Sequence, residues 1–195
     1  IRDLRFVLYE LLGAENLAAL PGYESATPDV VMAAIEQTGL LCEEVLLPLN
    51  ARGDEEGCRY ENGVVTTPAG FKDAYRKFAE GGWVGISCDP EYDGQGLPQV
   101  LNFVVSEIAC ASNLALSIYV GLSQGAYHGI AAHASEELKK RYLPPLSTGR
   151  WTGTMCLTEP HCGTDLGLVR TRAERNEDGS YRVSGTKIFI SAGEH

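Results

Sequence analysis

The strongest constraint on the fold of this chain is a change in its hydrophobic pattern near Trp151. Up to about residue 150, apolar residues recur at the spacing of helices. After Trp151 they alternate with polar residues, as in "LVRTRAERNEDGSYRVSGTKIFIS", and Asn176 to Gly179 forms a turn between two strands. The sequence therefore predicts an α+β fold, with an all-helical bundle followed by an antiparallel sheet that has one face in solvent.

Start and stop signals divide the helical part. A second helix begins with Thr27 as its N-cap and Pro28 at its first position, and Pro48 is expected to end it. Before it, the opening "RDLRFVLYELL" predicts a helix with one apolar stripe. That stripe consists of Leu4, Val7, Leu8, Leu11 and Leu12.

The next segments repeat this pattern of signals. "YENGVV" contains an Asn-Gly pair and predicts a short hairpin. "TTPAGFKDAYRKFAEGG" predicts a helix that starts at Thr67 and Pro68 and ends at the glycine pair 81–82. From Gln99 to Ala134, small and apolar residues occupy all faces, so we expect buried helices at the centre of the bundle.

One motif in the buried region imitates a catalytic site. "GLSQG" at 121–125 matches the G-x-S-x-G nucleophile elbow, which requires a strand before the serine and a helix after it. The flanking text reads as continuous helix, so we interpret Ser123 as a packing residue. The following "SEELKKRYLPPL" predicts an exposed helix capped by Ser135.

Composition excludes several classes of function. The chain of 195 residues has a formal net charge of −10, whereas nucleic acids and anionic membranes require clustered Lys and Arg. No apolar run approaches the roughly 20 residues of a membrane span. The six cysteines are scattered and predict reduced thiols in a cytoplasmic protein. The chain begins at Ile1 and stops one strand into a sheet, so we expect it to be part of a longer polypeptide.

The stretch Met155 to Asp165, "MCLTEPHCGTD", is the most distinctive in the chain. Its cysteines and histidine lack the paired C-x-x-C spacing of structural zinc sites, so we predict no metal. A reactive thiol at Cys162 stays open, because it depends on a cationic or helix-terminal neighbour. An ordinary strand and turn at these positions is also open. Glu159 belongs to the T-E-P turn and is expected to satisfy backbone groups or a basic neighbour.

The same stretch resembles the signature of the acyl-CoA dehydrogenase family, in which T-E-P is followed two residues later by G-[ST]-D. Three further segments resemble the family in the same order: "GWVGISCDPEYDGQGLP", "SEELKKRYLPPLSTGRWTG" and "GSYRVSGTKIFIS". The opening "RDLRFVLYELLG" and the ending "SAGEH" resemble the subgroup with an extra N-terminal helix, which includes 3-methylmercaptopropionyl-CoA dehydrogenases.

The resemblance implies both a domain division and a reaction. Residues 1–150 would form the N-terminal helical domain, with the extra helix at 1–20, and 151–195 the first part of a flavin-binding β-barrel or sandwich domain. The enzyme would be a flavoprotein oxidoreductase of fatty acid metabolism that binds FAD. It would desaturate an acyl-CoA thioester, such as 3-methylthiopropanoyl-CoA, between its α and β carbons, with hydride passing to flavin N5. An electron-transfer flavoprotein would accept the electrons, and the enzyme would form a homodimer or homotetramer.

The resemblance also assigns cofactor contacts, residue by residue. Apolar residues would lie along the flavin, hydroxyls would reach its polar edge, and a glycine would let the backbone come close. Thr164 would contact the cofactor or the CoA arm of the substrate. Residues near Ile118 to Ser123 would help to line the acyl pocket. The flavin contacts are Met155, Leu157, Thr158, Gly163, Thr164, Phe189, Ile190 and Ser191.

Three questions stay open on the sequence alone. The family's catalytic glutamate lies in a later helical domain, so we assign no catalytic base in this chain and expect the chain by itself to be inactive. His161 and Cys162 replace small residues of the family pattern, and their role is open. An acyl-CoA oxidase, a nitroalkane-oxidase-like flavoenzyme and a non-catalytic scaffold that binds CoA esters or proteins are the alternative functions.

Overall fold

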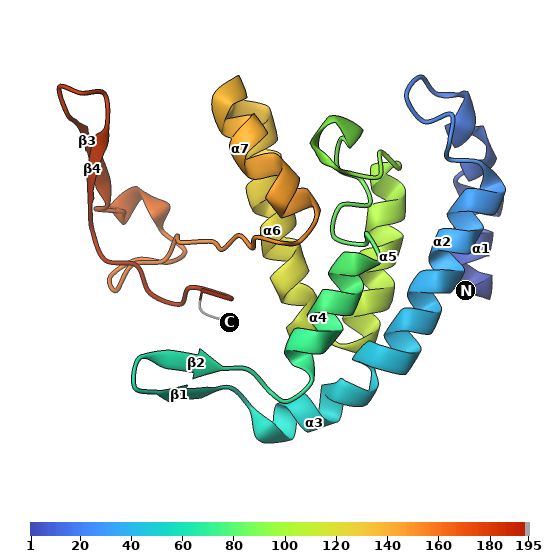
Figure 1. Ribbon diagram of the computed structural model, residues 1–195, viewed down its shortest axis with the longest axis horizontal. Helices are drawn as coiled ribbons and strands as arrows, with labels where there is room; N and C mark the ends of the chain where they lie inside the picture. Colours follow the sequence, from blue (N-terminus) through green and yellow to red (C-terminus); the bar gives the residue numbers. More distant parts are fainter. Residues whose placement is uncertain (194–195) are drawn as a thin grey trace.

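The computed structural model describes residues 1–193; it is mainly helical up to Ser147, with one small β-hairpin in that part, and a second hairpin follows (Figure 1). Glu194 and His195, which end the "SAGEH" segment, lie outside the described residues. The α+β class is confirmed. The helical elements are α1 (Arg2–Arg5), η1 (Phe6–Leu11), η2 (Ala14–Ala19), α2 (Pro28–Leu41), η3 (Cys42–Leu46), α3 (Pro48–Glu56), α4 (Phe71–Glu80), η4 (Pro90–Tyr92), α5 (Gln99–Ser112), α6 (Leu114–His133), α7 (Glu136–Ser147) and η5 (Leu166–Leu168). The strands are β1 (Arg59–Glu61), β2 (Val64–Thr66), β3 (Arg172–Arg175) and β4 (Tyr181–Ser184).

The N-terminal segment is helical, but its leucine stripe is only partly buried. Leu8 is 2% exposed, whereas Leu11 and Leu12 are 62% and 63% exposed. Val7 is also 44% exposed, so the predicted stripe is wrong at Val7, Leu11 and Leu12. The physical reason is that the described residues leave this side of η1, a π-helix, uncovered.

Helix α2 begins as predicted, because the Thr27 hydroxyl accepts a hydrogen bond from the Val30 amide and Pro28 occupies the first turn. The prediction that Pro48 ends this helix is wrong. The backbone stays helical at Leu47, with φ −59° and ψ −44°, and α3 starts at Pro48. Two features remove the usual conflict. Proline in a first helical turn lacks no required N–H, and the preceding π-helix η3 bonds Leu47 N to Cys42 O at 2.8 Å.

The Asn-Gly hairpin is confirmed. Strands β1 and β2 pair antiparallel, and Asn62 and Gly63 connect them with φ of 52° and 81°. The predicted start of the next helix at Thr67 is wrong, because α4 begins after Gly70, whose φ of +92° turns the chain just before the helix. The end of α4 before the glycine pair 81–82 agrees with the prediction.

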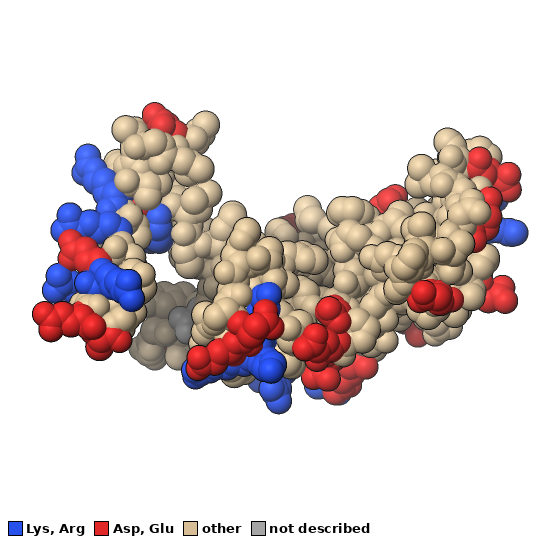
Figure 2. Space-filling model, turned by 90° about the horizontal axis from the view of Figure 1, so that it is seen from above, with Lys and Arg blue, Asp and Glu red and all other residues tan. Residues whose placement is uncertain are grey.

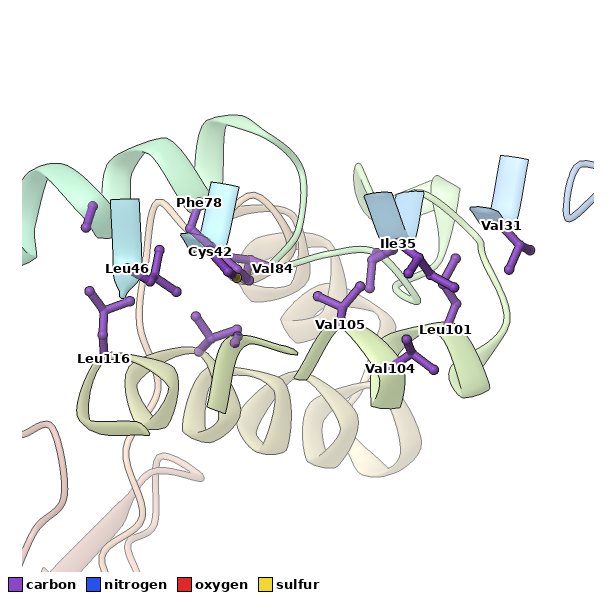
Figure 3. Packing of buried hydrophobic residues seen from close by; sticks show 14 of the residues in the cluster. Val31, Ile35, Cys42, Leu46, Phe78, Val84, Leu101, Val104, Val105 and Leu116 are labelled. Atoms are coloured by element: carbon purple, nitrogen blue, oxygen red, sulfur yellow. The ribbon is translucent and has the colours of Figure 1, made fainter. Parts of the chain in front are cut away.

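The main hydrophobic core lies between α2, α4 and α5, with the start of α6 closing one end (Figure 3). Along this core, Leu46 lies near Leu116 of α6 at one end, and Ile35 of α2 lies near Leu101 of α5 toward the other; all four are almost fully buried. Within residues 1–193, no helix has both the length and the apolar character to cross a membrane.

Helix α6 is less buried than its composition predicts. Its buried side chains form a single stripe, Leu116, Val120, Ser123 and Tyr127. The opposite side is open, since a Cβ placed on Gly125 would meet no atom within 4 Å. The prediction that this helix lies at the centre of the bundle is therefore wrong for the part of the chain described. Neighbouring helices cover only one of its faces.

Helix α7 packs against α6, and the chain then crosses to the C-terminal hairpin, red at the left of Figure 1. Ser135 caps α7 as predicted, by accepting from the Leu138 amide. Strands β3 and β4 pair antiparallel around the predicted turn. The prediction of one buried face is wrong in the described chain, because nearly every residue of both strands is exposed.

Charge is distributed unevenly over the molecule. In the view of Figure 2, Lys and Arg gather at the left, the side of the β3–β4 hairpin in Figure 1, and acidic residues predominate at the opposite end. Within the hairpin, Glu174 accepts ion pairs from Arg172 and Arg182 at 3.2 and 2.8 Å. The net charge of −10 is therefore concentrated on the helical part.

Candidate functional site

The segment that leads into the distinctive stretch is fixed to the helical part by side-chain hydrogen bonds. Tyr75 Oη donates to the carbonyl of Gly149 at 3.0 Å. The Gly153 amide donates to Ser123 Oγ at 3.1 Å, and this hydroxyl in turn donates to Tyr119 O at 2.9 Å. Ser123 is 1% exposed and lies on a helix, so the interpretation of "GLSQG" as packing and not as a nucleophile elbow is confirmed.

Residues 159–162 and 165–168 form two successive tight turns. Glu159 and Cys162 exchange backbone hydrogen bonds at 2.9 and 3.1 Å, which closes a turn over Pro160 and His161. A second turn follows where the Asp165 carboxylate accepts from the Gly167 amide at 3.0 Å. The sulfur of Cys162 is buried inside the first turn, so a reactive thiol at this position finds little access.

The carboxylate of Glu159 lies at the centre of this region and is 3% exposed. It accepts from the amides of Arg170 and Thr171 and from Lys187 Nζ, each at 2.9 Å. Hydrogen bonds from Thr171, from the Arg170 amide and from the Lys187 ammonium hold the pKa of Glu159 well below its usual range. The prediction that Glu159 satisfies backbone groups and a basic neighbour is confirmed, and the residue is unsuited to accept a proton.

The two strips assigned to the flavin by resemblance lie side by side. Met155 and Ser191 form an antiparallel bridge. The Ile188 amide donates to the carbonyl of Thr158 at 2.9 Å. Residues 155–158 and 188–191 therefore form one continuous backbone surface, although they are well separated in the sequence.

The side chains of these two strips are largely open to solvent. Met155, Leu157 and Phe189 are 56%, 40% and 84% exposed. Phe189 has a φ of 56°, an unusual value for a non-glycine residue. Within residues 1–193, the hydroxyls of Thr158 and Ser191 have no hydrogen-bond partner. Ile190 is partly buried.

Gly163 and Thr164 have a looser connection to the rest of the site. A Cβ on Gly163 would lie 3.5 Å from Thr158 Cγ2, an ordinary contact. The Thr164 side chain is exposed and makes no hydrogen bond to another described residue. The structure thus places Gly163 beside Thr158 of the first strip, and within residues 1–193 no hydrogen bond joins Thr164 to the second strip.

Three potential metal ligands come close together in the first turn. One ligand atom each from Glu159, His161 and Cys162 lies within 4.8 Å of the others. These atoms already have partners, because Glu159 accepts three hydrogen bonds and His161 Nε2 lies 2.9 Å from the carbonyl of Leu168. The Lys187 ammonium beside Glu159 also disfavours a cation. We therefore assign no metal to this cluster.

Sequence reasoning missed Lys187. Its ammonium donates to the carbonyl of Leu157 at 2.9 Å in addition to Glu159, and its side chain is only 20% exposed. The available signal was its position in "TKIFIS", where a single cation interrupts apolar strand residues. A lysine there needs a buried acceptor, and Glu159 is the buried carboxylate of the same region.

Comparison with known proteins gives the family context. Residues 33–150 match the family model for the N-terminal domain of acyl-CoA dehydrogenases. The chain is 41% identical over 195 residues to a 3-methylmercaptopropionyl-CoA dehydrogenase of Ruegeria pomeroyi. This match covers 100% of the present chain and 33% of that protein. It is 33% identical over 200 residues to a butyryl-CoA dehydrogenase of Syntrophomonas wolfei, with 100% and 33% covered.

A solved structure shows the same fold. The acyl-CoA dehydrogenase of Bacillus anthracis, determined as a complex with FAD, matches with a TM-score of 0.69 at 24% sequence identity. This match covers 86% of the present chain and 27% of the other. The chain spans about a third of the length of the curated relatives it matches.

Proposed function

Since the chain belongs to the acyl-CoA dehydrogenase family, we propose that the protein carrying it is an FAD-dependent acyl-CoA dehydrogenase. Residues 1–150 would be its N-terminal helical domain and residues from 151 onward the beginning of its flavin-binding β-domain. When bound, FAD supplies the hydride acceptor for α,β-desaturation of the acyl-CoA. Consistent with six free thiols, the protein would act in the cytoplasm.

The observation that carries the proposal is the surface formed by residues 155–158 and 188–191. Exposed apolar side chains and hydroxyls without partners in the described chain lie together on two adjacent strips. This combination fits a flat aromatic ring with polar edges, because the ring needs apolar contact on its face and hydrogen-bond donors at its rim. The residues present therefore fit a flavin.

Each residue of this surface has a proposed part in binding. Met155, Leu157, Phe189 and Ile190 would contact the ring. The hydroxyls of Thr158, Thr164 and Ser191 would donate hydrogen bonds that favour the electron-rich reduced flavin, and Thr164 would also meet the CoA arm. Gly163 would leave room for the cofactor beside the turn. No residue is assigned as the catalytic base, since Glu159 is fully engaged.

The substrate is proposed to be an acyl-CoA with a short acyl chain. A cavity of about 90 Å³ lies between α4, α5 and α6, and its walls include Val120, Gly121 and Gln124. Ile118 and Ser123 are not among its lining residues. An apolar cavity of 150 Å³ holds a benzene molecule, so this smaller space suits a tail of only a few heavy atoms. The similar dehydrogenases named for 3-methylmercaptopropionyl-CoA and butyryl-CoA support this substrate class.

Two partners follow from the proposal. A dehydrogenase passes electrons to another protein and not to oxygen, so an electron-transfer flavoprotein would be the acceptor. The exposed face of α6 and the two-sided exposure of β3 and β4 leave room for further contacts. A homodimer or homotetramer would provide some of them.

The test is an anaerobic titration of the complete protein with acyl-CoAs of increasing chain length, including a thioether-containing one. We expect the purified protein to be yellow, and we expect short acyl-CoAs to bleach the flavin absorbance. Coenzyme A without an acyl group is the control, because it can bind but has no acyl α and β hydrogens to lose.

The other outcomes separate the alternatives. A colourless protein that takes up no FAD would refute the proposal. Rapid reoxidation by oxygen with release of peroxide would identify an oxidase. Bleaching by a nitroalkane, with none by any acyl-CoA, would identify a nitroalkane-oxidase-like enzyme. Uptake of FAD with no bleaching by any substrate would identify a scaffold without turnover.

A further inference from the structure

Lys187 makes two charge-assisted hydrogen bonds that meet at the first flavin strip. Its Nζ donates to the carbonyl of Leu157 and to Glu159 Oε1, each at 2.9 Å. The side chains of Lys187 and Glu159 are 20% and 2% exposed. Ion pairs with so little solvent have fixed geometry, in contrast to exposed pairs whose long side chains move freely.

Glu159 extends this contact to a third segment. Its two carboxylate oxygens accept from the backbone amides of Arg170 and Thr171, at 2.9 Å each. The T-E-P turn, the start of the β-hairpin region and the segment before the second strip are therefore tied together at one carboxylate. Lys187 is the one cation within hydrogen-bond distance of Glu159 among the lysines and arginines of residues 1–193.

The contact with Leu157 has a separate consequence from the contact with Glu159. A peptide unit is planar and trans, so the direction of a carbonyl fixes the direction of the N–H that follows it. The Lys187 bond to the Leu157 carbonyl therefore fixes the peptide that leads into Thr158. The next carbonyl, that of Thr158, accepts from the Ile188 amide at 2.9 Å. Two successive peptides of the first strip are thus held by residues 187 and 188.

We propose that Lys187 is a positioning residue for the flavin, which orients the Leu157–Thr158 peptide for contact with the cofactor. This inference rests on the proposed function. If Lys187 served only to neutralise the charge of Glu159, its hydrogen bond to the Glu159 carboxylate would be enough. The second bond ends on the backbone of the strip that would touch the ring. The cofactor then meets a surface whose groups are already oriented, which lowers the ordering cost of binding.

The experiment compares three variants of the complete protein. Lys187→Met removes the charge and keeps the length of the side chain. Lys187→Arg keeps the charge that Glu159 requires but brings a planar head to the Leu157 carbonyl. Arg182→Met is the matched control, because it removes one positive charge from β4, where the Arg182 side chain is 73% exposed and contacts Glu174.

The measurements are the dissociation constant for FAD, the visible spectrum of bound flavin and the melting temperature of the apoprotein. Since hydrogen bonds to charged groups are strong, we expect Lys187→Met to raise the FAD dissociation constant at least about tenfold and to shift the flavin spectrum. Lys187→Arg should raise the constant at least about twofold with little change in apoprotein melting. Arg182→Met should leave all three unchanged.

The outcomes distinguish this inference from the proposed function. If the unmodified protein binds no FAD, both are wrong. If it binds FAD and both Lys187 variants bind it equally tightly with an unchanged spectrum, Lys187 is only a structural brace and this inference alone is wrong. Should Lys187→Met fail to fold, the FAD constant of Lys187→Arg decides, because that variant keeps the ion pair.

Discussion

Replacing Ser123 by alanine tests how the site segment is attached to the helical part. The Ser123 hydroxyl is buried on α6 and accepts from the Gly153 amide, which begins the path to the distinctive stretch. Alanine leaves this buried amide without a partner, and an unsatisfied buried donor costs about 1–3 kcal/mol. The local opening that exposes the amide should therefore become about 5- to 150-fold more frequent.

Hydrogen exchange of the Gly153 amide measures this opening directly, by NMR or by mass spectrometry of a peptide that contains it. Ser117→Ala is the control, because the Ser117 hydroxyl donates to the Asn113 carbonyl on the same helix and accepts from no amide. Its exchange profile at Gly153 should match that of the unmodified protein. Unchanged exchange in Ser123→Ala, or an equal increase in both variants, would refute the reasoning.

Three other predictions concern close packing, acid stability and the cofactor. Gly94→Ala places a Cβ 2.0 Å from the Cys88 carbonyl oxygen and should destabilise the protein by about 3 kcal/mol or more. Gly121→Ala places its Cβ in open space on a helix and should stabilise the protein by about 0.5–1 kcal/mol. Chemical denaturation measures both free energies of unfolding, and similar effects of the two variants would contradict the geometry. Because the pKa of Glu159 is lowered in the folded protein from its ordinary 4.5, its contribution to stability is complete above that pH and is lost as the pH falls further. Acid titration should show this loss, and Glu159→Gln, less stable at neutral pH, should lack that part of the slope. The added methyl group of Gly163→Ala makes only an ordinary contact in the protein, so the melting temperature of the apoprotein should not change. The same methyl group would occupy the space proposed for the cofactor, so the dissociation constant for FAD should rise at least about tenfold. Equal FAD affinity would remove Gly163 from the site.

The sequence predicted those parts of the fold that depend on neighbouring residues. Thr27 with Pro28, and Asn62 with Gly63, act through their own backbone preferences, so their cap and turn appear where expected. Pro48 was misread because its usual effect depends on the helix before it. The preceding turn is π-helical, and the chain continues as a helix through Pro48; the sequence pattern does not indicate a π-helical turn.

Burial was harder to predict than secondary structure, because it depends on what covers each face. Leu11 and Leu12 have the pattern of a buried stripe and lie in solvent, as do the strands β3 and β4. Only the elements within residues 1–193 are available to cover them here. An apolar pattern shows that a face can be buried, but it does not show which other element covers that face.

The candidate site was predictable in its location and not in its support. The motif around Thr158 and Gly163 indicated a cofactor loop, and the structure brings the segment around Thr158 beside Ile188. Lys187 was missed because its role comes from a contact with Glu159, 28 positions away in the sequence. Such a pairing cannot be read from local spacing, although a lone lysine between apolar residues was a usable sign.

That separation in sequence also sets an order of events during synthesis. At about 5–20 residues per second, Lys187 leaves the ribosome about 1 to 6 seconds after Glu159. Local helical contacts form in microseconds to milliseconds, so the helical part has time to fold while the T-E-P turn still lacks its cation. The proposed flavin surface is therefore the later of the two to be completed, and the newly made helices have to stay folded before a cofactor could bind there.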